Sequence, residues 1–130
     1  MNPEMAALLR EAKTIAVVGL SSDEFRPSHG VAAYLQQHGY RIVPVNPKET
    51  SILGETCYAD LASIPVPVDI VDIFRRSEAV PEIVDEAIRI GARGVWMQEG
   101  VRHAEAAAKA RAAGLAVAED LCILKEHRKL

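Results

Sequence analysis

Short, mostly apolar runs alternate along the chain with longer segments in which apolar residues recur every three or four positions. Runs of strand length with few polar residues are typical of strands buried on both faces of a sheet. The wider spacing predicts amphipathic helices. We predict strands at residues 15–18, 41–45, 68–74, 94–98 and 115–118. We predict helices that begin near Pro3, Pro27, Val80, His103 and Ile123.

Local signals support several of these boundaries. Asn2 and Pro3 suit the cap and the first position of a helix, and Gly39 suits the left-handed position that ends one. Pro44 cannot donate to a ladder, so it belongs near the end of its strand or where its nitrogen would face no neighbour. Residues 50–67 are less regular, and we expect turns, two short extended pieces and one helical turn there.

Strands that alternate with helices imply right-handed crossovers and a mostly parallel sheet covered on both faces. The predicted fold class is therefore α/β, a doubly wound, Rossmann-like sheet with helices on both faces. A length of 130 residues indicates one domain spanning residues 1–130. Ligands of such sheets bind beyond the carboxyl ends of the strands, near the point where the strand order reverses. The candidate site residues are those that directly follow each strand.

Composition narrows the function classes. Eighteen acidic against fifteen basic residues give a net charge of −3, which argues against nucleic acid as the main partner. No apolar run approaches the ~20 residues that cross a bilayer, and the N-terminus does not resemble a secretion signal. Cys57 and Cys122 have neither zinc-ligand nor disulfide-scaffold spacing. We expect a cytoplasmic protein with no membrane partner.

A nicotinamide dinucleotide is the default ligand of this architecture, and its sequence determinants are missing. The fingerprint needs Gly-x-Gly-x-x-Gly in the first turn and an acidic residue at the end of the second strand. Here the first turn, residues 19–24, contains a single glycine, and the second strand runs into Asn46, Pro47 and Lys48. A Gly-Lys-Ser/Thr phosphate loop is also absent.

Hydroxyl and cationic side chains occupy those positions instead. Ser21, Ser22 and Ser28 can donate hydrogen bonds to phosphate oxygens, and Arg26 can grip a phosphate through two donors. The helix that begins near Pro27 directs free N–H groups and the positive end of its dipole at the same space. Lys48 and Arg75 or Arg76 add positive charge at neighbouring strand ends, with Arg75 favoured and Arg76 expected to be a surface charge. The pattern indicates an extended ligand that carries several phosphates.

Five motifs stand in order along nearly the whole chain. They are Gly-Leu-Ser-Ser followed by Arg-Pro-Ser (19–28), Gly-Tyr-Arg-Ile-Val-Pro-Val-Asn-Pro (39–47), Val-Asp-Ile-Val-Asp-Ile-Phe-Arg-Arg (68–76), Gly-Val-Trp-Met-Gln-Glu-Gly (94–100) and Asp-Leu-Cys-Ile (120–123). With these motifs the chain resembles the stand-alone CoA-binding family, which is similar to the N-terminal CoA-binding domain of the succinyl-CoA synthetase α subunit.

The resemblance implies that coenzyme A, or an acyl-CoA, binds along the strand ends. It assigns the phosphates to Gly19, Ser21, Ser22, Arg26 and Ser28, and the nucleotide border to Asn46, Pro47 and Lys48. It places Phe74 and Arg75 at the next strand end, and Gln98, Glu99 and Gly100 beside the pantetheine arm. One departure is visible, because Leu121 stands where the family usually has arginine in Asp-Arg-Cys. If that arginine neutralises a phosphate or an acidic neighbour, its loss weakens binding.

The resemblance favours binding without catalysis. Acyl-CoA ligation needs an activating group, such as a phosphorylated histidine, and a second nucleotide site, which lie in further domains of the similar synthetases. No nucleophile in the sequence is paired with an oriented base. Two alternatives stay open, a nicotinamide-dependent oxidoreductase and one part of a split acyl-CoA ligase. A regulatory protein whose CoA occupancy changes its contacts is a third, so a protein partner or a homo-oligomer also stays open.

The remaining chemically distinctive residues have simpler interpretations. We expect His29 to be structural and Trp96 to fill the core, and we expect Asp69 and Asp72 to accept hydrogen bonds from backbone. The other histidines, His38, His103 and His127, are expected at the surface. Cys122 is expected to be a small buried residue. A mixed disulfide between Cys122 and the CoA thiol is the alternative hypothesis.

Overall fold

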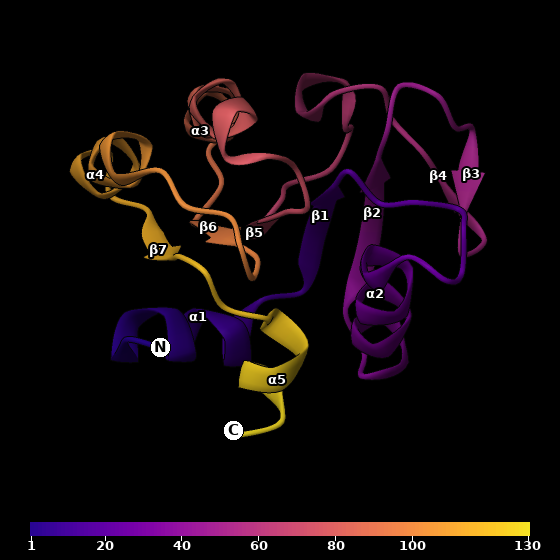
Figure 1. Ribbon diagram of the computed structural model, residues 1–130, viewed down its shortest axis with the longest axis horizontal. Helices are drawn as coiled ribbons and strands as arrows, with labels where there is room; N and C mark the ends of the chain where they lie inside the picture. Colours follow the sequence, from indigo (N-terminus) through magenta and orange to yellow (C-terminus); the bar gives the residue numbers. More distant parts are fainter.

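A computed structural model describes residues 1–130, and its centre is one five-stranded parallel sheet (Figure 1). The strand order is β2-β1-β5-β6-β7, so the order reverses between β1 and β5. This confirms the predicted α/β class and the parallel sheet. The strands are β1 (Thr14–Val18), β2 (Arg41–Val45), β5 (Ile70–Ile73), β6 (Gly94–Met97) and β7 (Ala116–Ala118). β5 is shorter than the predicted 68–74, since pairing begins only at Ile70.

Helices cover both faces of the sheet, as expected. One layer consists of α1 (Pro3–Glu11), α2 (Pro27–Gln37) and α5 (Ile123–His127), below the sheet in Figure 1. The other consists of α3 (Val80–Arg89), α4 (Ala104–Ala112) and the 3₁₀ turn η1 (Leu61–Ser63). A second 3₁₀ turn, η2 (Ser77–Ala79), leads into α3.

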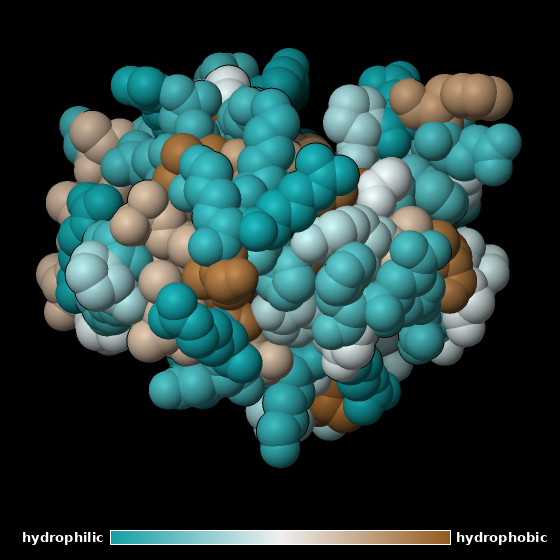
Figure 2. All heavy atoms as spheres, turned by 90° about the horizontal axis from the view of Figure 1, so that it is seen from below, coloured by the Kyte–Doolittle hydropathy of each residue, from teal (hydrophilic) through white to brown (hydrophobic).

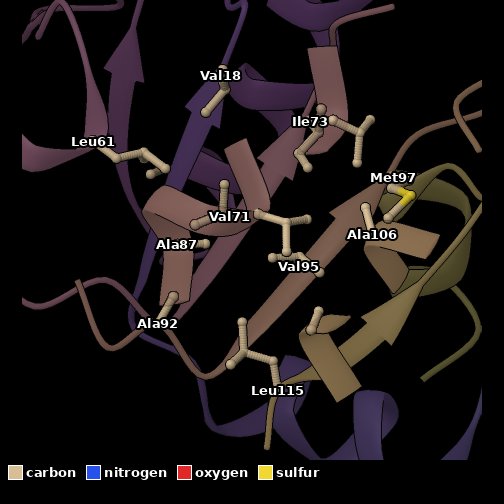
Figure 3. Close-up of a cluster of buried hydrophobic side chains, with 14 of the residues drawn as sticks. Val18, Leu61, Val71, Ile73, Ala87, Ala92, Val95, Met97, Ala106 and Leu115 are labelled. Atoms are coloured by element: carbon tan, nitrogen blue, oxygen red, sulfur yellow. The ribbon is translucent and has the colours of Figure 1, made fainter. Parts of the chain in front are cut away.

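Alternation along the strands divides the core into two apolar clusters. In β1, Ala16 and Val18 face α3 and α4, whereas Ile15 and Val17 face α1, α2 and α5. Figure 3 shows the first cluster, in which strand residues such as Val95 lie against helix residues such as Ala87 and Ala106. Because each strand is buried on both sides, it reads in the sequence as a continuous apolar run.

The element boundaries follow from local chemistry. The Asn2 side chain accepts a hydrogen bond from the Met5 N–H at 2.7 Å and caps α1. Gly39 has φ +94° and ends α2. Pro44 lies in β2, an edge strand of the main sheet, so its missing donor breaks no ladder. Residues 50–67 form a small hairpin of β3 (Ser51–Ile52) and β4 (Glu55–Thr56), followed by η1.

Two histidines expected at the surface have structural roles. His103 caps α4, because its Nδ1 accepts the Ala106 N–H at 3.1 Å. His127 is partly buried and lies 2.7 Å from the Tyr34 hydroxyl, which joins α5 to α2. Desolvation and the neighbouring His38 together lower the pKa of His127 from its ordinary value. The sequence does not predict this cluster of Tyr34, His38 and His127, since α2 and α5 lie far apart along the chain.

Two aspartates near β5 behave differently. The Asp69 carboxylate accepts the Lys13 and Thr14 N–H groups at 2.9 and 3.0 Å, which confirms the prediction for this residue. Asp72 is completely buried, beside Val17 and Trp96 in the sheet register, and neither carboxyl oxygen has a hydrogen-bond partner. The prediction of backbone hydrogen bonds for Asp72 is therefore wrong. Burial raises the pKa of Asp72 well above its ordinary value.

No helix of the structure is both long enough and apolar enough to span a bilayer.

Replacing Asp72 tests this buried carboxyl. Because its pKa is raised in the folded state, the Asp72 carboxyl lowers the free energy of unfolding at high pH. This loss is absent below the unfolded pKa of 3.8 and grows as the pH rises above it. We expect the unfolding free energy of Asp72→Asn to exceed that of the wild type by an amount that grows between pH 4 and pH 7. Asp72→Leu, of the same shape, should gain about 1–3 kcal/mol, because an unpaired buried polar group is removed. Urea denaturation measures both, and a difference for Asp72→Asn that is constant with pH would contradict the raised pKa.

Candidate functional site

The candidate site begins where β1 and β5 lie side by side and the strand order reverses. Gly19 directly follows β1 and donates its N–H to the Val45 carbonyl at 2.9 Å. Its φ is +88°, and a Cβ at this position would overlap the carbonyl oxygen of Phe74. Only glycine fits both the backbone conformation and the close approach. The single glycine of the first turn therefore brings the ends of β1 and β5 together.

The loop after Gly19 folds back onto the first turn of α2. The Ser21 N–H donates to the buried Ser28 hydroxyl at 3.1 Å, and the Ser21 hydroxyl accepts the Asp23 N–H at 3.0 Å. His29 Nδ1 lies 3.0 Å from the Ser21 carbonyl oxygen, in keeping with the structural role expected for it. The hydrogen bonds of Ser21 and Ser28 thus fix the conformation of the loop.

The start of α2 is open to an anion. Arg26 occupies the cap position with an exposed side chain, and no side chain caps the helix. The first turn contains no acidic residue. Uncapped N–H groups and the helix dipole favour a negatively charged ligand at this end. The Arg26 guanidinium adds a full positive charge beside them.

The end of β2 is joined to the same loop through Asn46. Its side-chain nitrogen donates to the Leu20 carbonyl at 3.0 Å, and its side-chain oxygen accepts the Lys48 N–H at 2.9 Å. Ser22 is exposed, and its hydroxyl donates to Glu49 at 3.0 Å. The Asn46 side chain therefore holds the loop, while Pro47 and Lys48 are exposed beside it.

Positive charge gathers along this edge of the sheet without acidic partners. Arg26, Lys48, Arg75 and Arg76 are exposed, and none of them forms an ion pair in the structure. Elsewhere, basic side chains are often paired, as in Lys109 with Asp85 at 2.6 Å. Lys48 follows β2, Arg75 and Arg76 follow β5, and Arg26 lies at the start of α2. This is the region for which the sequence predicts a phosphate-rich ligand.

A cleft of about 550 Å³ opens beside the cations, beyond the ends of β5 and β6. Figure 2 shows the surface hollowed at its upper right, beside an apolar projection. The predicted residues Phe74, Arg75, Gln98 and Glu99 line the cleft. The other lining residues are Pro27, Val31, Arg76, Val101 and Cys122.

Gln98 is held firmly at the base of the cleft. Only 5% of Gln98 is exposed, and its side-chain oxygen accepts the Ile123 N–H at 3.1 Å. Its amide nitrogen has no hydrogen-bond partner in the protein and is not sealed from solvent. Because the small exposed part of Gln98 borders the cleft, this nitrogen is a donor available to a ligand there.

Asp120 fixes the loop that follows β6. Its carboxylate accepts the Gly100 N–H at 2.7 Å and two hydrogen bonds from the Arg102 guanidinium at 3.0 and 2.6 Å. The Gly100 N–H and then the Arg102 guanidinium lower the pKa of Asp120 below its ordinary value. Glu99 is exposed and pairs with Lys125 at 3.1 Å. Gly100 thus positions the loop and does not line the cleft.

The structure divides the predicted site residues into two groups. One group lines the cleft, and the other forms the turns and the cationic edge beside it. The second group comprises Gly19, Ser21, Ser22, Arg26, Ser28, Asn46, Pro47, Lys48 and Gly100.

Part of the cleft wall is not predicted by the sequence. Arg76, expected to be a surface charge, lines the cleft together with the favoured Arg75. The position of Arg76 shortly after the buried strand β5 was the feature of the sequence that could have indicated this. Val31 and Val101 had no such signal, because an apolar residue in the sequence shows only that it is buried, not that it borders a cavity.

Comparison with known proteins identifies the family. The model of the CoA binding domain family matches residues 13–128, almost the whole chain. The chain belongs to this family. It is similar to the uncharacterized protein YneT of Bacillus subtilis (strain 168), at 40% identity over 124 residues that cover 95% of this chain and 92% of that protein.

Two other similarities place the domain in context. An Archaeoglobus fulgidus protein named acetate–CoA ligase [ADP-forming] II is 33% identical over 101 residues, which cover 72% of this chain but only 15% of the ligase. A solved structure from Thermus thermophilus, described as cell-free ID.343, is 40% identical with a TM-score of 0.93 and covers 99% of this chain and 98% of that chain. The domain therefore occurs both as a short protein and as a small part of a much longer ligase.

The close approach at Gly19 can be tested by adding one methyl group. We expect Gly19→Ala to lower the unfolding free energy by roughly 2 kcal/mol or more, because the left-handed backbone and the Phe74 carbonyl both resist a Cβ. Gly30→Ala is the matched control, since Gly30 lies within α2 and a Cβ there meets nothing within 4 Å. It should stabilise the protein by about 0.5–1 kcal/mol. Denaturant unfolding compares them, and equal effects would contradict the steric argument.

Proposed function

We propose that the chain binds coenzyme A or an acyl-CoA along the carboxyl edge of the sheet, without catalysing a reaction on its own. The observation that carries the proposal is the set of unpaired cations after β2 and β5 and at the start of α2, which are Lys48, Arg75, Arg76 and Arg26. Coenzyme A carries its phosphates along an extended body, so one bound molecule would meet several of these side chains. Membership of the CoA binding domain family supports the same ligand.

The arrangement favours one orientation of the ligand. The phosphates lie at the uncapped start of α2, near Gly19 and Arg26, with Ser22 and Lys48 at hand for the nucleotide part. The pantetheine arm runs past Phe74 and Arg75 into the cleft that Gln98 and Glu99 border. Ser21, Ser28 and Asn46 contribute mainly by holding the loop, because their side chains are engaged within the protein.

The absence of catalysis is part of the proposal. None of the histidines lines the cleft, and the carboxylate of Glu99 there is paired with Lys125. Such a cleft offers a ligand charge, shape and hydrogen bonds, but no nucleophile activated by a neighbouring base.

The similarity to the acetate–CoA ligase favours a second candidate. The matched region covers only 15% of that ligase. This chain would then supply the CoA site of a ligase assembled from separate chains. Co-purification of the chain with a protein that restores ADP-forming ligase activity would support this candidate over simple binding.

Titration calorimetry with coenzyme A, dephospho-CoA and NADH at one fixed salt concentration tests the proposal. We expect coenzyme A to bind most tightly and dephospho-CoA more weakly, because removal of the 3′-phosphate removes charge that the cationic edge can bind. We expect NADH to bind most weakly, because it carries the same diphosphate charge as dephospho-CoA but has no pantetheine arm to occupy the cleft. Tighter binding of NADH than of coenzyme A would overturn the proposal in favour of the oxidoreductase alternative.

The role of Arg26 can be measured in the same experiment. We expect Arg26→Ala to weaken CoA binding by about 1–3 kcal/mol, the range for a hydrogen bond to a charged group. Arg41→Ala is the matched control, because Arg41 is exposed and unpaired at the opposite, amino end of β2. It removes the same charge and should leave the affinity nearly unchanged. If both variants bind alike, Arg26 is not part of the site.

A further inference from the structure

Cys122 is the only sulfur-bearing residue that lines the cleft. It follows β7, directly precedes α5, and is 9% exposed. The other cysteine, Cys57, is elsewhere, beside the end of β2, where its thiol lies 3.4 Å from the Asn46 carbonyl oxygen. Burial raises the pKa of the Cys57 thiol. The chain therefore carries one thiol inside the cleft and one outside it.

Gln98 provides an independent sign that this part of the cleft receives a ligand. Its side chain is held by the backbone N–H of Ile123, the residue next to Cys122. Gln98 is 5% exposed, has a free amide nitrogen and lines the same cleft as Cys122. The Gln98 side-chain nitrogen can donate a hydrogen bond to the carbonyl oxygen of a ligand amide. A pantetheine arm contains amides close to its terminal thiol.

We propose that Cys122 exchanges with CoA disulfide, so that the site retains CoA covalently under oxidising conditions. This inference rests on the proposed function, since CoA binding is what brings the reacting sulfur to the cleft. The Cys122 thiol loses its proton, and the thiolate attacks one sulfur of the CoA disulfide. The CoA–CoA disulfide bond breaks as the Cys122–CoA disulfide bond forms. The released CoA thiolate takes up a proton, so one disulfide replaces another and no further oxidant is needed.

The surroundings of the cleft give the reaction selectivity. The cleft that Cys122 lines is bordered by Arg75, Arg76 and Gln98. A disulfide that carries CoA phosphates is held there by the cations, which raises its effective concentration at the sulfur. Oxidised glutathione carries carboxylates but no phosphates and has less net negative charge than CoA disulfide, so the cations attract it more weakly. Cys57 lies outside the cleft and provides an internal control within the same molecule.

Intact-protein mass spectrometry with peptide mapping tests the proposal on the full chain. The reduced protein is incubated with CoA disulfide, and adducts on Cys122 and Cys57 are followed with time. We expect Cys122 to react at least about tenfold faster than Cys57, and at least about tenfold faster than with oxidised glutathione. Dithiothreitol should remove the adduct. Desulfo-CoA, which cannot react, should slow modification of Cys122 and leave that of Cys57 unchanged.

The outcomes separate this inference from the proposed function. Selective, desulfo-CoA-sensitive modification of Cys122 supports it. No adduct, equal rates at the two cysteines, or an equal rate with oxidised glutathione overturns it. If calorimetry shows CoA binding but no selective adduct forms, only this inference fails, whereas no CoA binding at all removes the proposed function first. Cys122→Ser should lose the adduct, and the mapping of wild-type protein decides the question even if that variant does not fold.

Discussion

The structure depends on one close approach, that of the turn after β1 to the end of β5. Gly19 adopts a left-handed conformation and lies against the Phe74 carbonyl, where no side chain fits. This contact occurs between β1 and β5, where the strand order reverses. The sheet extends from there to β2 on one side and to β6 and β7 on the other. It brings the start of α2, the cations of the strand ends and the cleft to a common edge. A larger residue would separate the strand ends and disperse the site.

The distribution of charge follows from the same arrangement. The chain is acidic overall, yet its carboxyl edge leaves Arg26, Lys48, Arg75 and Arg76 without acidic partners. Like charges placed near one another repel, and this repulsion lowers stability unless an anion is present. An anionic ligand would therefore stabilise the folded protein as it binds. Net charge alone argues against nucleic acid but gives no information on this local concentration.

The sequence predicts the fold well, because a strand that is buried on both faces is a continuous apolar run in the sequence. It predicts the site only in part. Asp69 and Asp72 look equivalent in the sequence, but two N–H groups of a neighbouring segment reach Asp69 and none reaches Asp72. The cleft wall is also predicted only in part, since Val31 and Val101 come together only after the sheet and the helices have packed. Residues that follow strands can be predicted as site residues, whereas those contributed by packing cannot.

The departure at Leu121 shows how the structure limits a conclusion drawn from a motif. Loss of the family's arginine there weakens binding only if that arginine neutralises a phosphate or an acidic neighbour. The acidic neighbour, Asp120, already has the Arg102 guanidinium and the Gly100 N–H as partners. Leu121 packs against the cluster under α1, α2 and α5, and its carbonyl accepts the Trp96 indole N–H at 2.8 Å. The loop is thus held by Arg102 and by apolar packing, so the missing arginine leaves no acid unpaired, and any effect on affinity must arise at the phosphates alone.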